Sequence, residues 1–413
     1  MSLLKKKNQP AKEVILALDI GTEFVKAVAA RVNDRMEIIG ATKLRQPLSN
    51  MHAGAIADIS GVTGVVEQAL IEVEKQAQTT LKKVVVGIAG ELIKGETSTI
   101  IYRRQNPEER ITVEEMENIV EKVEARVSEK MQKQIAIETS SPDAKIRLVN
   151  SALVGIQIDG YKINNPIGFQ GKEVAVQIYT AFAPLVHIGA IEKVCDELNL
   201  ELAAVATEPF AVFRAVTGND LSSQLTAILV DIGGGTTDVA VVDDGGVEGT
   251  KSFAIGGRSF TRQIASEMDV DYEEAEKLKL AEDTESVENK ERIEMAIAKN
   301  LKVWKVGVEL TLEEFGGLDH LPSKILLCGG GSSLPQIKET LDEPDFHEAL
   351  PFSKKPAVQL IKYGDLHGLR NETETVLDHS FVTAIGMLWV GSDTVLEPEK
   401  TDIISKLNKV LKH

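Results

Sequence analysis

The stretch Asp19-Ile20-Gly21-Thr22, just after the apolar run Val14 to Leu18, is the most informative part of this 413-residue chain. A second such stretch, Asp231-Ile232-Gly233-Gly234-Gly235-Thr236, follows the apolar run Ala227 to Val230. In both places a strand-like run comes directly after the turn, and a further turn and strand-like run follow it. A strand, Asp-Ile-Gly turn, strand, turn, strand unit therefore occurs twice, which is an internal repeat of a whole supersecondary unit.

The turns of this repeat indicate a phosphate site made by two hairpins. Each Asp-Ile-Gly turn joins two strands, whereas a P-loop or a dinucleotide-binding loop leads into a helix. Backbone N–H groups at the hairpin tips would then hold the phosphates, because glycine lets the chain approach a ligand closely. An aspartate at the end of the first strand can hold Mg²⁺ through water, and Lys26 adds a positive charge. Two facing hairpins of this kind would grip a triphosphate from both sides.

Three further features complete the pattern of the two repeats. A glycine loop, Gly329-Gly330-Gly331-Ser332, follows the predicted strand Ile325 to Leu327. Helical spacing of apolar residues predicts a helix over Val62 to Ala77 and helical structure within 272–315. In the latter, one face is expected to be buried; it consists of Ile293, Ile297, Leu301, Trp304 and Val308.

The block between the two repeats has a different pattern. Strands are predicted over Thr99 to Arg103, Val149 to Ile158 and Glu173 to Ala181. The string Thr112-Val113-Glu114-Glu115 indicates a capping box that opens a charged helix through about Lys133. We expect this block to be a self-contained α+β insertion.

Composition excludes several classes of protein. The net charge of −17 argues against a nucleic-acid partner, since most of the surface would repel it. The two cysteines, Cys195 and Cys328, are too few for a disulfide framework and suit a reducing cytosol. Nowhere do about 18 apolar residues run together, so the sequence predicts no membrane span.

The three loops, in this order, resemble the phosphate-1, phosphate-2 and adenosine motifs of the actin/Hsp70/sugar-kinase superfamily. The segments Ala206 to Ala211 and Ser380 to Gly386 resemble its two connecting helices. Within the superfamily the chain is most similar to the bacterial cell-division family FtsA, from about Val14 to Gly391, and the pilus family PilM is the nearest relative. Four features favour FtsA over the other families of the superfamily. The first is the place of the insertion, and the second is the string Asn165-Pro166-Ile167-Gly168 with Gly171. The other two are Phe253-Ala254-Ile255-Gly256-Gly257 with Thr261 and Ile264-Ala265, and the helix segment Ala275-Glu276-Lys277-Leu278-Lys279.

The resemblance implies the architecture. The chain would be an α/β, actin-like two-lobed ATPase with duplicated ribonuclease H-like lobes and an inserted α+β subdomain, 1C. The expected divisions are lobe I (1A) over 14–87 and 181–223, 1C over 88–180, lobe II (2A) over 224–258 and 323–379, 2B over 259–322, a closing helix and short linker over 380–400, and a C-terminal amphipathic helix over 401–413.

The resemblance also implies the ligands, ATP and Mg²⁺, and the residues that bind them. Asp19 and Asp231 would hold the hydrated magnesium. The β- and γ-phosphates would be faced by Gly21, Thr22 and Lys26 from one lobe and by Gly233, Gly234, Gly235 and Thr236 from the other. The adenosine pocket would be lined by Gly256, Gly257, Gly329, Gly330, Gly331 and Ser332, with Glu276 and Lys279 reaching the ribose or adenine.

Catalysis, where it occurs, is assigned to Glu208, Asp231 and Asp238, of which Glu208 and Asp238 would orient the attacking water. ATP is expected to act mainly as a conformational and assembly ligand, with slow hydrolysis at most. Structural alternatives exist for two assignments. Glu208 also suits a helix start before Pro209, and Glu276 and Lys279 also suit solvated positions on an acidic helix.

The tail, Thr401 to His413, has the pattern of a basic amphipathic helix, with five aliphatic residues on one side and Lys406, Lys409 and Lys412 on the other. Members of FtsA end in such a membrane anchor. The alternative is that this helix docks on the body of the protein.

The resemblance implies a scaffold that polymerises, lies peripherally on the cytoplasmic face of the inner membrane and tethers the FtsZ ring. Subdomain 2B would receive the FtsZ tail, with Lys299, Lys302 and Lys305 as candidate contacts or, alternatively, as a solvated stripe.

Two other functions are alternatives. A PilM-like platform for type IV pilus assembly is favoured by Lys26, which follows Asp19 by seven residues, and opposed by the tail and the Asn165–Gly171 string. A small-molecule kinase is disfavoured by the large insertion and the lack of a sugar motif.

Overall fold

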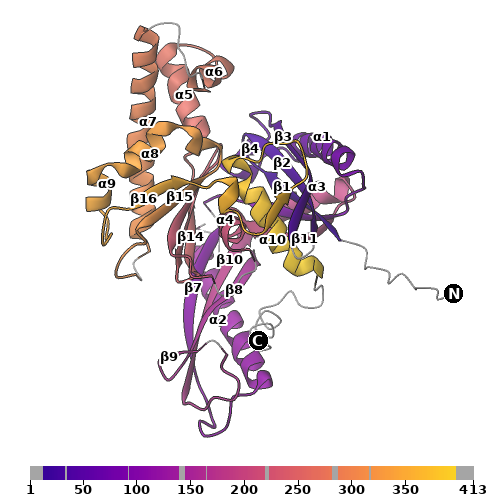
Figure 1. The fold of residues 1–413 in the computed structure, drawn as a ribbon, viewed down its shortest axis with the longest axis vertical. Coiled ribbons are helices and arrows are strands. Elements are labelled where there is room, and N and C mark those ends of the chain that lie inside the picture. Colours follow the sequence, from indigo (N-terminus) through magenta and orange to yellow (C-terminus); the bar gives the residue numbers. More distant parts are fainter. Residues whose placement is uncertain are drawn as a thin grey trace, which may run out of the picture.

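Two β-sheets, each built around one copy of the repeat, form the framework of the computed structural model (Figure 1). The structure describes residues 13–32, 35–91, 93–138, 145–163, 165–218, 223–280, 287–315 and 318–396. The first sheet has the order β11-β6-β1-β2-β3-β17. Its strands are β1 (Val14–Ile20), β2 (Phe24–Val32), β3 (Met36–Arg45), β6 (Lys83–Ile88), β11 (Glu201–Thr207) and β17 (Leu369–Asn371).

The second sheet has the order β16-β15-β12-β13-β14-β7-β10-β8-β9. Five of its strands belong to lobe II: β12 (Ala227–Ile232), β13 (Thr237–Asp243) and β14 (Gly246–Phe253) of the second repeat, with β15 (Lys324–Cys328) and β16 (Ala357–Leu360). Like β1, β2 and β3, strands β12, β13 and β14 form an antiparallel meander. A parallel strand then lies beside the first strand of each repeat, β6 beside β1 and β15 beside β12. The two lobes therefore share one topology, which confirms the duplication.

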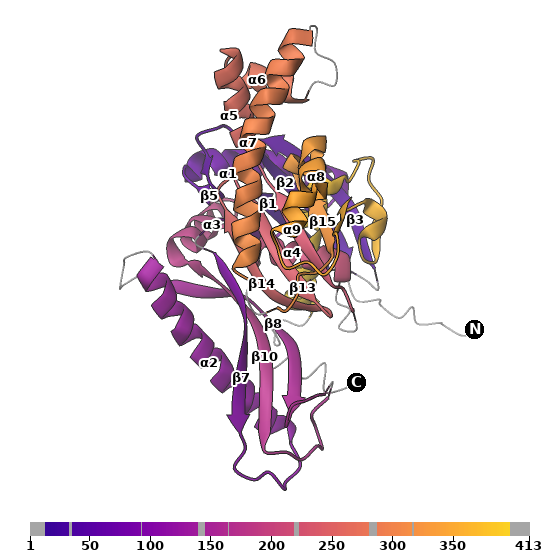
Figure 2. The ribbon, with the colours of Figure 1, turned by 90° about the vertical axis from the view of Figure 1, so that its left-hand side faces the viewer.

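The inserted block continues the sheet of lobe II. Its strands are β7 (Lys94–Arg103), β8 (Ile146–Ile158), β9 (Tyr161–Lys162) and β10 (Glu173–Pro184), and its helix is α2 (Val113–Glu138). Strand β7 pairs with β14 through Gly249↔Glu96 and Thr250↔Gly95. The block has its own hydrophobic core, but the expectation of a self-contained unit is wrong for its sheet (Figure 2).

The start of α2 shows half of the expected capping box. The Thr112 hydroxyl accepts a hydrogen bond from the backbone N–H of Glu115 (3.2 Å), as a helix cap should. The Glu115 carboxylate, however, accepts from the buried guanidinium of Arg104. In a full capping box the Glu115 carboxylate would accept from the backbone N–H of Thr112. Here it pairs with Arg104 instead, because a buried arginine needs a charged partner.

Two helices lie between the lobes and pack against each other. They are α4 (Glu208–Thr217) and α10 (Val382–Leu396). Their apolar side chains share one core with residues of both sheets, such as Ala17 and Leu229. Since β17 pairs with β3, the chain after lobe II joins the sheet of lobe I before α10 begins.

The remaining helices belong to one lobe or the other. On lobe I lie α1 (Ile59–Ala77) and α3 (Leu185–Glu197), near the small β4 (Met51–His52) and β5 (Ala55–Ile56) hairpin. On lobe II lie α5 (Gly257–Met268), α6 (Tyr272–Leu280), α7 (Val287–Glu313), α8 (Pro335–Asp342) and α9 (Pro344–Glu348). Most of these helices lie on the sheets, whereas α5 and α6 pack with α7 beyond the sheet of lobe II (Figure 1). The predicted stripe from Ile293 to Val308 is buried on α7, which confirms that expectation. Among the described helices, none combines the length and the apolar character that a bilayer crossing needs.

Candidate functional site

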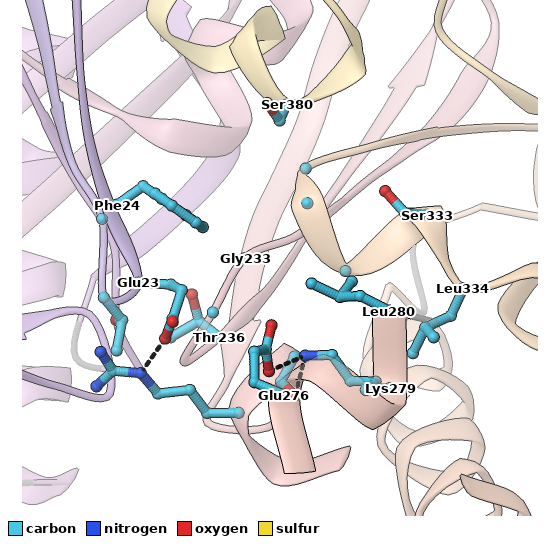
Figure 3. Close-up of a pocket in the computed structure, with 18 of the residues that line it drawn as sticks. Glu23, Phe24, Gly233, Thr236, Glu276, Lys279, Leu280, Ser333, Leu334 and Ser380 are labelled. Atoms are coloured by element: carbon cyan, nitrogen blue, oxygen red, sulfur yellow. Dashed lines mark hydrogen bonds and ion pairs between the residues drawn. The ribbon is translucent and has the colours of Figure 1, made fainter. Parts of the chain in front are cut away.

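The two Asp-Ile-Gly hairpins face each other across a pocket of about 760 Å³ between the lobes (Figure 3). In both hairpins the Asp is the second-to-last residue of a buried strand and pairs across the ladder with a polar residue, Asp19 with Lys26 and Asp231 with Asp238. The pocket is lined by most of the predicted residues: Asp19, Gly21, Thr22, Lys26, Glu208, Asp231, Gly233, Gly234, Thr236, Gly257, Glu276, Lys279, Gly329, Gly330 and Gly331.

The hairpin tips also touch each other. A Cβ atom added to Gly234 would lie 2.8 Å from Cβ of Glu23, and one added to Gly235 would lie 2.6 Å from the Thr22 hydroxyl oxygen. Real side chains do not tolerate such distances from fixed neighbours. Glycine is therefore needed at these two positions for one hairpin to approach the other, in addition to any need to approach a phosphate.

Four predicted site residues lie behind the pocket wall: Gly235, Asp238, Gly256 and Ser332. Gly256 packs on the second hairpin, since an added Cβ would lie 2.7 Å from the Gly233 carbonyl oxygen. The Ser332 hydroxyl donates to the Gly329 carbonyl (2.7 Å) and so supports the third glycine loop. These residues shape the pocket rather than line it.

The carboxylates of Asp19, Asp231 and Glu208 and the ammonium group of Lys26 lie together at the base of the hairpins. Lys26 Nζ is 2.5 Å from Asp19 Oδ2, and Thr383 of α10 donates a hydrogen bond to Asp231. Burial opposes the charge of Lys26, but Asp19 and Asp231 outweigh it and raise the pKa of Lys26. Burial, followed by Asp19 and Asp238, raises the pKa of Glu208 well above its usual range. The cluster carries more negative than positive charge, which suits a divalent cation.

The fit to magnesium depends on the number of ligands. Within the residues that the structure describes, no group of three or more His, Cys, Asp or Glu side chains is arranged to hold a metal ion. Mg²⁺ keeps several waters and often takes only one or two protein carboxylates. Asp19 and Asp231, both buried and both lining the pocket, match that mode.

Asp238 lies one side chain away from the pocket. Its carboxylate accepts hydrogen bonds from the Thr236 hydroxyl (2.8 Å) and from Ser252. Burial raises the pKa of Asp238 to about 7, against the two hydrogen bonds, and Asp231 adds to the increase. Asp238 therefore reaches the pocket through Thr236, which does line it.

Glu208 combines both predicted roles. It is the first residue of α4, followed by Pro209 in the first turn, as a helix start should be. Its side chain also lines the pocket. The position that begins the helix is thus the position that brings a carboxylate to the site.

At the other end of the pocket, Lys279 Nζ donates to Glu276 (2.6 Å) and to the Thr261 hydroxyl (2.8 Å). Both charged side chains are largely buried, so the alternative that they are solvated is wrong. Figure 3 shows them on the opposite wall from Glu23 and Phe24, with Leu280 and Leu334 beside them. Polar groups that meet apolar walls suit a ligand with both sugar and ring-like parts.

Sequence reasoning missed several residues that line the pocket: Glu23, Phe24, Lys43, Gly54, Ala89, Arg258, Tyr272, Leu278, Leu280, Lys290, Glu294, Ser333, Pro335, Gln336, Asp378 and Ser380. Glu23 and Phe24 adjoin the first glycine turn, and that adjacency could have indicated them. Arg258 directly follows Gly257 and could have been indicated in the same way, whereas Tyr272 carries no such signal and is brought to the site by tertiary packing.

The three candidate lysines of α7 do not form a common exposed face. Lys299 pairs with Glu267 of α5 (3.2 Å), while Lys305 pairs with Asp345 of α9 (2.6 Å) and is only 13% exposed. Lys302 is exposed. The predicted tail helix, 401–413, lies outside the described residues.

Comparison with known sequences agrees with the resemblance to FtsA. The family model "Cell division protein FtsA" matches residues 228–386. The FtsA protein of Pseudomonas aeruginosa is 24% identical over 414 residues, covering 92% of this chain and 89% of that protein. The FtsA protein of Neisseria meningitidis is 26% identical over 270 residues, covering 64% of this chain and 60% of that protein.

Comparison with solved structures confirms the expected fold. A chain of a PilM-PilN type IV pilus biogenesis complex superposes with a TM-score of 0.65 at 18% identity, covering 92% of this chain and 99% of that one. The ethanolamine utilization protein EutJ from Carboxydothermus hydrogenoformans gives a TM-score of 0.50 at 16% identity, with 92% and 91% covered. The chain has the actin-like, two-lobed α/β fold, and its resemblance to FtsA is confirmed.

Proposed function

We propose that this chain is an FtsA-like scaffold that binds ATP with magnesium in the pocket between its lobes. The observation that carries the proposal is the pair of Asp-Ile-Gly hairpins facing one pocket, with buried carboxylates at its base and Glu276 and Lys279 at its far end. The similarity to FtsA proteins over most of the chain supports the same reading.

In this proposal each part of the pocket binds one part of the nucleotide. Backbone N–H groups of the two hairpins, with Lys26, bind the β- and γ-phosphates. Asp19 and Asp231 hold the hydrated Mg²⁺, which supplies positive charge against the phosphates. Glu276 and Lys279 bind the ribose or adenine beside the third glycine loop. Glu208, which lines the pocket, and Asp238, which acts through Thr236, are the candidates for orienting a water.

Ligand-induced stabilisation tests nucleotide binding. ATP with Mg²⁺ should raise the melting temperature, because a ligand that binds only the folded state adds about 2.7 kcal/mol at about 100 times its dissociation constant. Asp231→Asn should lose the part of the effect that depends on Mg²⁺. Asp243→Asn, an exposed aspartate in the same hairpin, is the matched control and should keep it. No stabilisation of the unmodified chain at millimolar ATP and Mg²⁺ would overturn the proposal.

The scaffold part of the proposal adds filaments, membrane and partner. We infer that the ATP-bound chain polymerises, that residues 401–413 bind the cytoplasmic face of the inner membrane, and that subdomain 2B receives the FtsZ tail. Many weak anchors on one filament would act together, which compensates for a short helix. Co-sedimentation with anionic liposomes, with and without residues 401–413 and with ATP and Mg²⁺, tests the anchor. Equal co-sedimentation of the full chain and the truncated chain would contradict the membrane-anchor proposal.

The partner site now has a narrower candidate. Lys302 and Lys299 are both exposed, although Lys299 pairs with Glu267, whereas Lys305 is only 13% exposed and pairs with Asp345. Binding of an FtsZ tail peptide should weaken in Lys302→Gln more than in Lys305→Gln. Equal loss in both variants would place the contact elsewhere or make it indirect.

The alternative is a PilM-like platform, which the seven-residue spacing from Asp19 to Lys26 favours. It predicts binding of a short peptide from a pilus membrane protein and no binding of the FtsZ tail. The two peptides, titrated against the same preparation, distinguish these functions.

A further inference from the structure

Glu23 and Arg258 form an ion pair that joins the two lobes at the wall of the pocket. Glu23 follows the first glycine turn in lobe I, and Arg258 is the second residue of α5 in lobe II. Arg258 Nε lies 2.6 Å from Glu23 Oε2. We propose that this pair is a latch that holds the lobes closed over the nucleotide and thereby limits the rate of nucleotide exchange. The inference rests on the proposed function.

Each partner is fastened to its own lobe. The backbone carbonyl of Glu23 accepts from Gln46 N–H (2.9 Å), and its carboxylate also accepts from Arg45 Nε (3.0 Å). The backbone N–H of Arg258 donates to the Gly234 carbonyl (2.8 Å), which ties α5 to the second hairpin. Because neither residue moves independently of its lobe, separation of the lobes must break the pair.

The pair is largely shielded from water. The side chains of Glu23 and Arg258 are 11% and 5% exposed. Arg258 also donates to the Leu48 carbonyl of lobe I (3.3 Å), and the Tyr272 hydroxyl lies 3.5 Å from Glu23 Oε2. Removing one partner of a buried pair leaves the other charge uncompensated, so each truncation should favour the open state.

The arginine retains a free donor for a ligand. Nη2 of Arg258 is buried and has no hydrogen-bond partner within the described part of the chain. Buried donors are normally satisfied, and both Arg258 and Glu23 line the pocket. An anionic oxygen of a bound nucleotide would satisfy this donor, so binding and closing of the latch would favour each other.

Nucleotide release and lobe separation are the two measurements. The first follows dissociation of a fluorescent N-methylanthraniloyl ATP, preloaded with Mg²⁺, after an excess of unlabelled ATP is added. The second measures the distance between spin labels at Gln68→Cys in α1 and Glu273→Cys in α6, without nucleotide. Both positions are exposed, and the two native cysteines are buried.

Glu23→Gln and Arg258→Gln should each speed dissociation by about tenfold or more, and the double variant should add little to either, as expected for two residues of one pair. Arg45→Gln is the matched control. It removes the other cation on Glu23, but it is 47% exposed and lies in the same lobe as Glu23, so its dissociation rate should stay within about twofold of the unmodified rate. The two latch variants should also show longer or broader label distances than Arg45→Gln.

Several outcomes would overturn the latch. One is equal acceleration by Arg45→Gln, which would mean that Glu23 acts only within its own hairpin. Another is additive effects in the double variant, and a third is unchanged label distances in all variants. If the unmodified chain fails to bind the fluorescent nucleotide, the proposed function fails, and the label distances still decide whether the pair holds the lobes together.

Discussion

Asp238 shows how a single residue can link stability to pH in this protein. Burial raises its pKa to about 7, so the folded chain holds the proton more tightly than the unfolded chain does. Its contribution to stability is complete below about pH 4 and is lost as the pH rises through about 7. Burial likewise raises the pKa of Glu208, so both groups act in the same direction.

Asp238→Asn should therefore become more stable relative to the unmodified chain as the pH rises from 5 to 8. The amide keeps an oxygen acceptor for Thr236 or Ser252 and carries no charge. The expected change in relative stability is on the order of 1–3 kcal/mol. Urea unfolding without nucleotide at pH 5, 6, 7 and 8 measures it. Asp243→Asn, at an exposed position, serves as control, and parallel pH curves for Asp238→Asn and the unmodified chain would contradict the prediction.

At the scale of elements, the contact between α10 and α4 places a strict limit on side-chain size. A Cβ atom added to Gly386 would lie 1.7 Å from the Ala211 carbonyl oxygen. The two helices share the core that joins both sheets, so their separation affects both lobes. Gly386 ends a segment that the sequence likens to a connecting helix, and this distance shows how closely that helix packs on α4.

Gly386→Ala should destabilise the protein by about 1–3 kcal/mol or more, because the added methyl group overpacks a backbone contact. Gly189→Ala in α3 is the matched control, since a Cβ there meets nothing within 4 Å. That control should be neutral or stabilising by up to about 1 kcal/mol through helix propensity. Thermal unfolding of the two variants compares them directly, and a tolerated Gly386→Ala would mean that α10 can shift away from α4.

Arg104 organises the loops at the far end of the inserted block. Its guanidinium donates to the Glu115 carboxylate (2.8 Å twice) and to the carbonyls of Gly171 (3.0 Å) and Glu109 (2.9 Å). Arg104→Gln should loosen these loops at a cost of about 2–4 kcal/mol, because the carboxylate and carbonyls lose a charged donor. Hydrogen exchange should rise in 104–115 and 165–173 and remain unchanged around the nucleotide pocket. The neighbouring Arg103→Gln, which removes an exposed pair with Glu173, should change stability by less than about 0.5 kcal/mol.

At the scale of the whole molecule, the net charge of −17 opposes association between copies and with anionic lipid. The proposed filaments should therefore form more readily as salt rises from about 10 mM to 150 mM, where the Debye length falls from about 30 Å to about 8 Å. Pelleting with ATP and Mg²⁺ at fixed protein concentration measures this. Assembly that decreases with salt over this range would indicate that complementary charges, and not apolar contacts, hold the copies together.

Much of the fold could be predicted from the sequence because its signals are local. Apolar runs, turn residues and helical spacing lie within a few residues of each other, so the two repeats, the stripe on α7 and the hairpin nature of the glycine turns are all visible in the chain. Asp19, Asp231 and Glu208, which line one pocket, lie in or beside a recognisable turn or helix start, whereas Glu276 and Lys279 were predicted from the resemblance to FtsA.

The pairing of distant segments was decided by the tertiary structure. Three examples are the pairing of strand β7 with β14, the ion pair of Lys305 with Asp345, and the ion pair of Glu23 with Arg258. In each, the partners lie far apart in the sequence, and no local pattern encodes their contact. The same holds for Asp238, whose strand position is predictable but whose depth behind Thr236 is not. Local patterns determine which backbone a segment adopts, whereas burial and charge pairing depend on which surfaces meet when all segments pack together.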